Sequence, residues 1–106
     1  MNGSWRRIAP DWTRLQILVA LDGSPGASLQ AVARQLRISA ATVHRHVWEA
    51  SRAGQLSIVG STNRTRRYPV TAAGGAEIAR LRGHFIAQLD ALVAVRGSSE
   101  GRHAAG

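Results

Sequence analysis

The sequence has no cysteine, no lysine and only six acidic residues among its 106. Without cysteine the chain can form neither disulfides nor thiolate metal sites, which agrees with a protein of the reducing cytosol. The longest apolar run, residues 17–21, is far shorter than the roughly 20 apolar residues that cross a bilayer. The basic residues near the start are not followed by an apolar stretch of signal-peptide length. We therefore expect a cytoplasmic protein with no membrane partner.

Arginine supplies all 14 basic residues, and the formal net charge is +8 with an isoelectric point near 11.9. A polyanion is the obvious partner for such a chain, although membrane surfaces and acidic proteins attract the same charge. The length suits one domain, to which an oligomeric interface would add useful stability. The position of the arginines in the fold therefore has to select the partner.

Residues 28–54 contain two short apolar series at helical spacing, separated by a break near Ile38. The series are Leu29, Val32, Ala33 and Leu36, then Val43, Val47 and Ala50. Ser28 and Ser39 stand where a serine oxygen can accept from free N–H groups of a first helical turn. Gly54 is placed to end the second helix in a left-handed conformation. Two short helices joined by a tight turn are typical of a helix-turn-helix, whose second helix enters the DNA major groove.

A further helix is predicted ahead of this motif. Asp11 is placed to cap it, and it ends at about Leu21. Its expected inner face consists of Trp12, Leu15, Leu18 and Val19. Residues 1–10 include glycine, serine and proline, so we expect them to form a flexible arm in front of a domain over residues 11–96.

Two segments after the motif have strand character. Residues 56–59 and 67–70 are separated by turn-forming residues that suit a hairpin tip. Pro69 has no N–H to donate, so its strand must lie at an edge. The sequence therefore predicts a small β-hairpin, or wing, which carries Asn63, Arg64, Arg66 and Arg67.

A last helix is predicted over about residues 73–95, with Thr71 as its cap. Its apolar stripe is longer than one small domain can cover, so we expect part of it to pack against a second copy of the chain. The predicted dimer interface consists of Trp12, Ile78, Leu81, Phe85, Leu89 and Leu92. Residues 97–106 have the composition of a disordered tail.

Together these elements resemble the winged helix-turn-helix regulators of bacteria, of the MarR, PadR and ArsR kind. The segment Ile38 to Val47, ISAATVHRHV, is similar to the I-S-x-x-T-V-x-R-H-hydrophobic motif of those families. The segment Tyr68 to Gly74, YPVTAAG, is similar to the Y-x-L-T-x-x-G with which their wing enters the last helix. The resemblance covers roughly residues 12–95 and implies a mainly α fold with a small β-hairpin and a long C-terminal dimerisation helix.

Two positions depart from the family pattern. Arg37 stands where the turn of the motif usually has glycine, and a positive φ is costlier for arginine. Ala50 stands where a larger apolar residue is usual, which leaves room that Trp48 or Trp12 would fill.

Steps of about 100° per residue turn one side of the second motif helix away from its apolar side and towards the groove. That side carries Ala41, Thr42, Arg45 and Glu49. The residues expected to contact DNA from this helix are Ser39, Ala40, Ala41, Thr42, His44 and Arg45. Arg45 either makes a bidentate contact with guanine, worth roughly 1–3 kcal/mol of discrimination, or contacts only a phosphate. The wing arginines either reach a minor groove or the adjacent backbone, or are merely solvated.

The pattern of polar residues argues against an enzyme. It has no paired carboxylates, no nucleophile with a base and no glycine-rich phosphate loop. His44 and His46 are two residues apart on a helix and so point to different sides, which argues against a metal site. We expect no cofactor. The resemblance to MarR-type regulators implies a small-molecule effector in a pocket lined by Trp12, Trp48 and Phe85, and constitutive binding is the alternative.

The sequence therefore predicts a homodimeric, sequence-specific regulator of transcription that binds double-stranded DNA, acts as a repressor and reads half-sites about one helical turn apart. The first alternative is an architectural or replication-associated protein that binds DNA with little sequence preference. The second alternative is a winged domain that binds an acidic protein.

Overall fold

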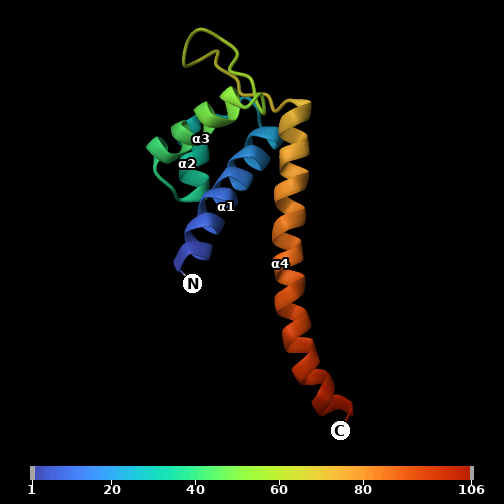
Figure 1. The fold of residues 1–106 in the computed structure, drawn as a ribbon. Coiled ribbons are helices and arrows are strands. Elements are labelled where there is room, and N and C mark those ends of the chain that lie inside the picture. Colours follow the sequence, from blue (N-terminus) through green and yellow to red (C-terminus); the bar gives the residue numbers. More distant parts are fainter. Residues whose placement is uncertain (1, 106) are drawn as a thin grey trace.

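The computed structural model describes the backbone of residues 2–105 and the side chains of residues 10–94. The helices follow in the order α1 (Asn2–Gly23), α2 (Leu29–Leu36), α3 (Ala40–Arg52) and α4 (Ala72–Ala105). The first three helices gather into one cluster, and α4 runs along α1 and then extends away from it (Figure 1). The prediction of a mainly helical winged fold with a long last helix is confirmed.

Helix α1 begins well before its predicted start. It runs from Asn2 through Pro10, so Asp11 lies inside the helix and the prediction that it caps the first turn is wrong. A proline inside a helix removes one backbone hydrogen bond but does not prevent the helix from continuing. The predictions of a flexible arm at 1–10 and a disordered tail at 97–106 concern residues whose side chains lie outside those described, and they stay predictions.

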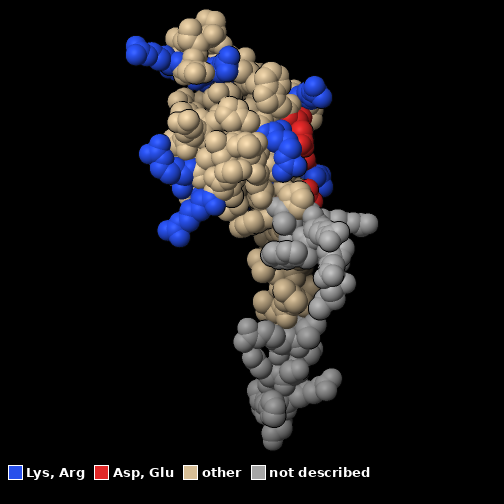
Figure 2. Space-filling model, turned by 90° about the vertical axis from the view of Figure 1, so that its left-hand side faces the viewer, with Lys and Arg blue, Asp and Glu red and all other residues tan. Residues whose placement is uncertain are grey.

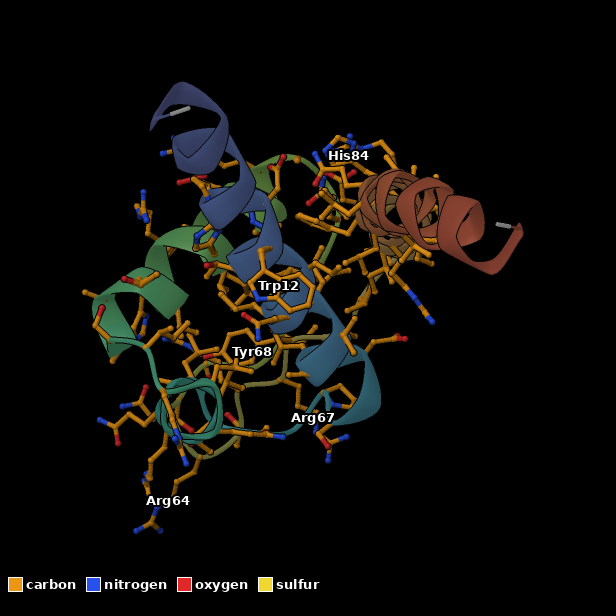
Figure 3. The ribbon with its side chains drawn as sticks, turned by 90° about the horizontal axis from the view of Figure 1, so that it is seen from below. Trp12, Arg64, Arg67, Tyr68 and His84 are labelled. Carbon is orange, nitrogen blue, oxygen red and sulfur yellow. The ribbon has the colours of Figure 1, made fainter. Side chains whose placement is uncertain are left out.

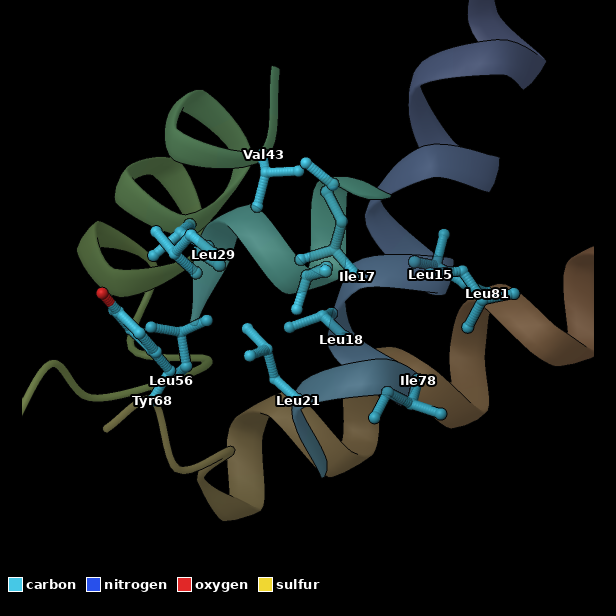
Figure 4. Packing of buried hydrophobic residues seen from close by; sticks show 14 residues of the cluster. Leu15, Ile17, Leu18, Leu21, Leu29, Val43, Leu56, Tyr68, Ile78 and Leu81 are labelled. Carbon is cyan, nitrogen blue, oxygen red and sulfur yellow. The ribbon is translucent and has the colours of Figure 1, made fainter. Parts of the chain in front are cut away.

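The buried side of α1 differs from the prediction. Leu15 and Leu18 are buried as expected, but Val19 is 46% exposed and Trp12 is 48% exposed. Ile17 and Leu21 are buried in their place. The reason is that α1 packs against α2 and α3 on one side and against α4 on the other, with Leu15 beside Leu81 of α4 (Figure 4). A helix held between two neighbours buries a wider arc than a single stripe at three- and four-residue spacing.

The helix-turn-helix forms as predicted. The Ser28 hydroxyl accepts from the Ala31 N–H at 3.0 Å, and the Ser39 hydroxyl accepts from the Thr42 N–H at 3.1 Å. Between the helices Arg37 has φ 59° and ψ 44°, which is the left-handed conformation. This conformation costs more free energy for arginine than for glycine, because arginine has a Cβ. Gly54 after α3 has φ 73°, as its predicted role at the end of this helix requires.

The wing lacks regular strands in the described part of the chain. The predicted strands at 56–59 and 67–70 run antiparallel, but only two isolated bridges join them, Leu56 with Val70 and Val59 with Arg67. Pro69 explains the interruption. The Ser57 N–H donates to the Pro69 carbonyl at 2.9 Å, yet Pro69 has no N–H to return the bond. The prediction of a small β-hairpin is therefore corrected to a hairpin-shaped loop with a broken ladder.

The wing leads into α4 through a tight junction. The Thr71 hydroxyl accepts from the Gly74 N–H at 3.1 Å, which confirms Thr71 as the predicted cap. The Thr71 N–H donates to the Gln55 carbonyl at 3.0 Å. Gly74 lies so close to this carbonyl that a Cβ at position 74 would overlap it. Helix α4 is thus fixed directly to the segment that follows α3.

Candidate nucleic-acid interface

Helix α3 lies at the outer side of the helical cluster, with the wing loop next to it (Figure 1). Its buried side carries Val43, His46, Val47 and Ala50. Its exposed side chains are those of Ala41, His44, Arg45, Trp48, Glu49 and Arg52. One side of this helix therefore holds it to the core, and the other is open along the length of the helix.

The predicted contact residues of α3 occupy different environments. Ala41, His44 and Arg45 are exposed and face outward. Ser39 and Thr42 are bonded to each other, with 2.7 Å between their hydroxyl oxygens. The methyl group of the remaining residue, Ala40, packs partly against the core. Ala41, His44 and Arg45 can therefore contact a partner directly, whereas Ser39 and Thr42 would first have to give up the hydrogen bond between them.

The wing brings some of its predicted residues towards α3 and leaves one apart. Asn63, Arg64 and Arg66 line a hollow of about 270 Å³ together with His44 of α3. Arg64 and Arg67 point to different sides of the wing, as Figure 3 shows from below. All the wing arginines are exposed. A cationic surface thus joins the wing to α3, and Arg67 lies away from it.

Charged side chains are unevenly distributed over this part of the molecule. Figure 2 shows arginines at several points around the face, with the acidic side chains gathered along one margin. One of the six acidic residues, Glu49, lies on α3 itself and is paired with Arg14 at 2.8 Å. The face is therefore positive with little local compensation, and it suits a polyanion.

A polar contact behind α3 was not predicted. The Arg14 guanidinium on α1 donates from Nε to His46 Nδ1 at 2.9 Å and from Nη2 to Glu49 Oε2 at 2.8 Å. His46 is only 4% exposed. Burial and the nearby positive charges of Arg14 and Arg45 lower the pKa of His46, so the ring is held neutral and can accept at Nδ1. One arginine thereby ties α1 to two positions of α3.

This contact also corrects the assignment of Glu49. The helical period predicts Glu49 on the groove-facing side, but the bond to Arg14 turns its carboxylate towards α1. Arg14 and His46 are 32 residues apart in the chain, so no local spacing could have joined them. Among the described residues, no group of three or more His, Cys, Asp or Glu side chains could hold a metal ion.

The residues predicted for a dimer interface fall into three groups. Ile78 and Leu81 are 9% and 1% exposed because they pack in the core of their own chain, and they offer no surface to a partner. Phe85 is half-buried and meets Trp12 edge to face, with 5.3 Å between ring centroids. Further along α4, the exposed apolar residues are Ile86, Leu89, Leu92 and Val93. The surface left for a second copy is thus narrower and lies further along the helix.

The three aromatic residues predicted to line an effector pocket do not meet. Trp12 and Phe85 contact each other, whereas Trp48 lies beside the wing among residues that include Ile58 and Tyr68. Trp48 is 59% exposed, so it does not fill the room beside Ala50. A separate groove of about 480 Å³ beside Trp12 lies between α1, the end of α2 and Arg82.

Comparisons with known proteins agree with this geometry. Residues 11–55 match a family model described as winged helix-turn-helix DNA-binding. Among curated proteins, none matches the sequence significantly. No helix in the described part of the chain has the length and apolar character that a membrane span needs.

Solved structures of MarR-family regulators share the fold. A MarR family transcription regulator aligns with a TM-score of 0.63 and 24% identity, over 86% of this chain and 66% of its own. A Mycobacterium tuberculosis MarR family protein in complex with salicylic acid aligns with a TM-score of 0.57 and 26% identity, over 78% of this chain and 62% of its own. A mutant of Staphylococcus aureus MepR bound to an oligodeoxyribonucleotide aligns with a TM-score of 0.58 and 17% identity, over 80% of this chain and 62% of its own.

The chain spans about two thirds or less of the lengths of these regulators. The match to the family model includes α2, α3 and the turn between them, and it ends before the wing arginines. Residues 11–55 thus match the winged helix-turn-helix DNA-binding model, and the chain has the fold of the MarR-family transcription regulators.

Proposed function

We propose that the chain is a homodimeric regulator that binds specific sequences of double-stranded DNA and represses transcription. The observation that carries the proposal is the outward face of α3, where Ala41, His44 and Arg45 are exposed beside Arg64 and Arg66 of the wing. Phosphate contacts from arginines supply affinity, and contacts to base edges supply sequence preference. This face offers both kinds of group within one surface.

In the proposed complex α3 lies in the major groove and the wing lies along the backbone beside it. Arg45 lies near the middle of α3 on this face, and its guanidinium can make a bidentate contact with guanine O6 and N7. Arg64 and Arg66 share a hollow with His44 and so approach the same stretch of DNA. Arg67, on the other side of the wing, contributes less to this contact.

The Arg45→Ala variant tests the recognition helix. It should lose preference at one base pair of each half-site, a cost of roughly 1–3 kcal/mol for a bidentate contact. The Arg64→Ala variant should instead weaken binding to all DNA alike and reduce the salt dependence. The measurement is selection from a random DNA library, followed by titration of selected and random duplexes at several salt concentrations.

Arg82→Ala is the matched control, because Arg82 is exposed on α4 and its loss removes the same charge away from the proposed DNA face. It should keep the wild-type preference. If Arg45→Ala retains both the affinity and the sequence preference of the wild type, the assignment of α3 as recognition helix is wrong.

The proposed dimer uses the exposed apolar stripe of α4. Ile86, Leu89 and Val93 follow at three- and four-residue spacing and are each more than half exposed. Large apolar patches of this kind mark interfaces between protein molecules. Pairing by a two-fold axis would bring two α3 helices to the two halves of a pseudo-palindromic site.

The Leu89→Asp variant tests this interface. A charge in the middle of an apolar stripe should shift the protein from dimer to monomer in analytical ultracentrifugation at micromolar concentration, because the buried carboxylate has no partner. Ala91→Asp is the control, since it adds the same charge to the opposite side of α4. A wild-type monomer at this concentration, or a dimer that survives Leu89→Asp unchanged, would remove the basis for the dimer.

The cationic face also suits an architectural protein that coats or bends DNA, and the net charge of +8 favours this second candidate. Its distinguishing result is similar affinity for selected and random duplexes. A small-molecule effector, if the regulator has one, would find an apolar groove beside Trp12 and Leu15. That groove adjoins α4 through Arg82, so a ligand there would contact both the DNA-binding cluster and the proposed dimer helix.

A further inference from the structure

Trp48 is exposed on the open face of α3. The side chain is 59% exposed, although tryptophan has a large apolar surface that folding normally covers. On a helix it lies three residues after Arg45 and four before Arg52, and all three side chains are exposed. The indole is therefore placed between two arginines on the side of α3 turned away from the core.

The indole lies next to the wing. Trp48 lines a small hollow of about 70 Å³ with His44 of α3 and with Ile58, Arg66 and Tyr68 of the wing. The wing is held at this point because the Tyr68 N–H donates to the Pro25 carbonyl at 2.8 Å. The indole thus borders the wing at this hollow, and more than half of its surface stays exposed.

We propose that Trp48 is a specificity-determining residue that packs on thymine methyl groups in the major groove. The inference rests on the proposed function, because it requires α3 to enter the groove. The C5-methyl group of thymine is the apolar feature that side chains can recognise on a major-groove base edge. A flat apolar ring between two cations suits a partner that is anionic along its backbone and apolar at this methyl group.

The spacing along α3 lets Arg45 and Trp48 contact neighbouring base pairs. Arg45 and Trp48 are three residues apart, which corresponds to about 4.5 Å along the helix axis. Successive base pairs are separated by about 3.4 Å along the duplex. Arg45 therefore offers hydrogen-bond donors to one base pair, and Trp48 offers an apolar surface to a neighbouring one.

The experiment combines a protein variant with a change of single atoms in the DNA. A duplex selected by the wild-type protein is synthesised with each thymine replaced in turn by uracil, which lacks the methyl group. For the wild type, one such replacement in each half-site should weaken binding several-fold. The Trp48→Ala variant should bind the selected duplex about ten times more weakly than the wild type does. The same uracil replacement should not weaken the binding of this variant further.

Two comparisons keep the outcome interpretable. Trp48→Phe retains an apolar ring and should retain part of the thymine preference, and thermal unfolding followed by circular dichroism reports whether each variant keeps the fold. Binding to random duplexes should change little in Trp48→Ala, because that binding depends on the arginines.

One result would overturn this inference and leave the proposed function intact. It is that the wild type prefers its selected duplex but Trp48→Ala keeps the full sensitivity to uracil. The inference is also overturned if Trp48→Ala weakens selected and random duplexes equally, since Trp48 would then act only on the fold or on general affinity. If the wild type shows no preference for the selected duplex, the proposed function itself fails and this inference fails with it.

Discussion

Replacing Gly74 by alanine should destabilise the chain by roughly 1–3 kcal/mol or more, the range found when atoms are forced into a filled space. A Cβ at this position would overlap the carbonyl oxygen of Gln55 and lie too close to the Val70 side chain. The Gln55 carbonyl cannot turn away freely, because it accepts the Thr71 N–H at 3.0 Å. The Gln55 N–H is also held, since it donates to Ala50 of α3 at 2.8 Å. Relief therefore has to come from moving α4 away from the end of α3.

Gly75→Ala is the matched control for this prediction. Apart from its chain neighbours and the backbone of its own helix, nothing lies within 4 Å of a Cβ built at Gly75, which lies in the first turns of α4. Alanine there should stabilise the helix by roughly 0.5–1 kcal/mol, because glycine loses more backbone freedom on folding. Urea unfolding of both variants at one protein concentration provides the comparison. Equal effects of the two substitutions would contradict the close approach of α4 to Gln55.

Replacing Leu18 by alanine should cost about 2–5 kcal/mol of unfolding free energy, the range for deletion of a buried leucine side chain. Leu18 has no exposed surface and lies between Leu21 and the residues of α2 and α3 in the core (Figure 4). The removed atoms leave a cavity that three packed helices cannot close without losing other contacts. Thermal and urea unfolding of the purified variant measure the loss.

The neighbouring Val19→Ala variant is the control for Leu18→Ala. The two residues are adjacent, and helical periodicity alone placed both on the inner face of α1. Because Val19 is 46% exposed, its truncation should cost less than about 1 kcal/mol. A loss for Val19→Ala as large as that for Leu18→Ala would show that α1 is rotated relative to the packing described above.

Much of the helix-turn-helix could be predicted because its signals are local. The hydroxyls of Ser28 and Ser39 reach N–H groups only three residues further along the chain, so sequence spacing alone specifies the bond. Arg37 replaces the glycine that is usual in the turn of this motif, and its φ of 59° shows that the turn keeps the conformation that glycine favours. Thr71 caps α4 by the same three-residue rule.

The errors concern features that depend on neighbours far away in the chain. Periodicity indicated one apolar face on α1, but its packing against α2 and α3 on one side and α4 on the other leaves Ile17 and Leu21 buried and Val19 exposed. Ile78 and Leu81 share a stripe with Leu89, yet α1 covers only the first two. The pattern of apolar residues in the sequence does not show whether the surface that packs against them belongs to the same chain or to another.

The candidate site was predicted in part for the same reason. The exposed residues Ala41, His44 and Arg45 follow from the helical period once the buried side of α3 is known. The bond from Arg14 to His46 and the separation of Arg64 from Arg67 depend on how α1 and the wing loop are placed. The room beside Ala50 predicts that Trp48 or Trp12 fills it, but the packing leaves Trp48 59% exposed on the same helix as Arg45.

By itself, the sequence determined the helices of the DNA-binding motif, their caps and the excess of positive charge, because these depend on neighbours within one or two turns and on composition. The tertiary structure alone decided which side of α1 is buried, which part of the α4 stripe remains for a partner and which side chains surround α3. Those outcomes depend on contacts between side chains far apart in the chain, such as the hydrogen bond between Arg14 and His46, which are 32 residues apart. Local spacing carries no information about such contacts.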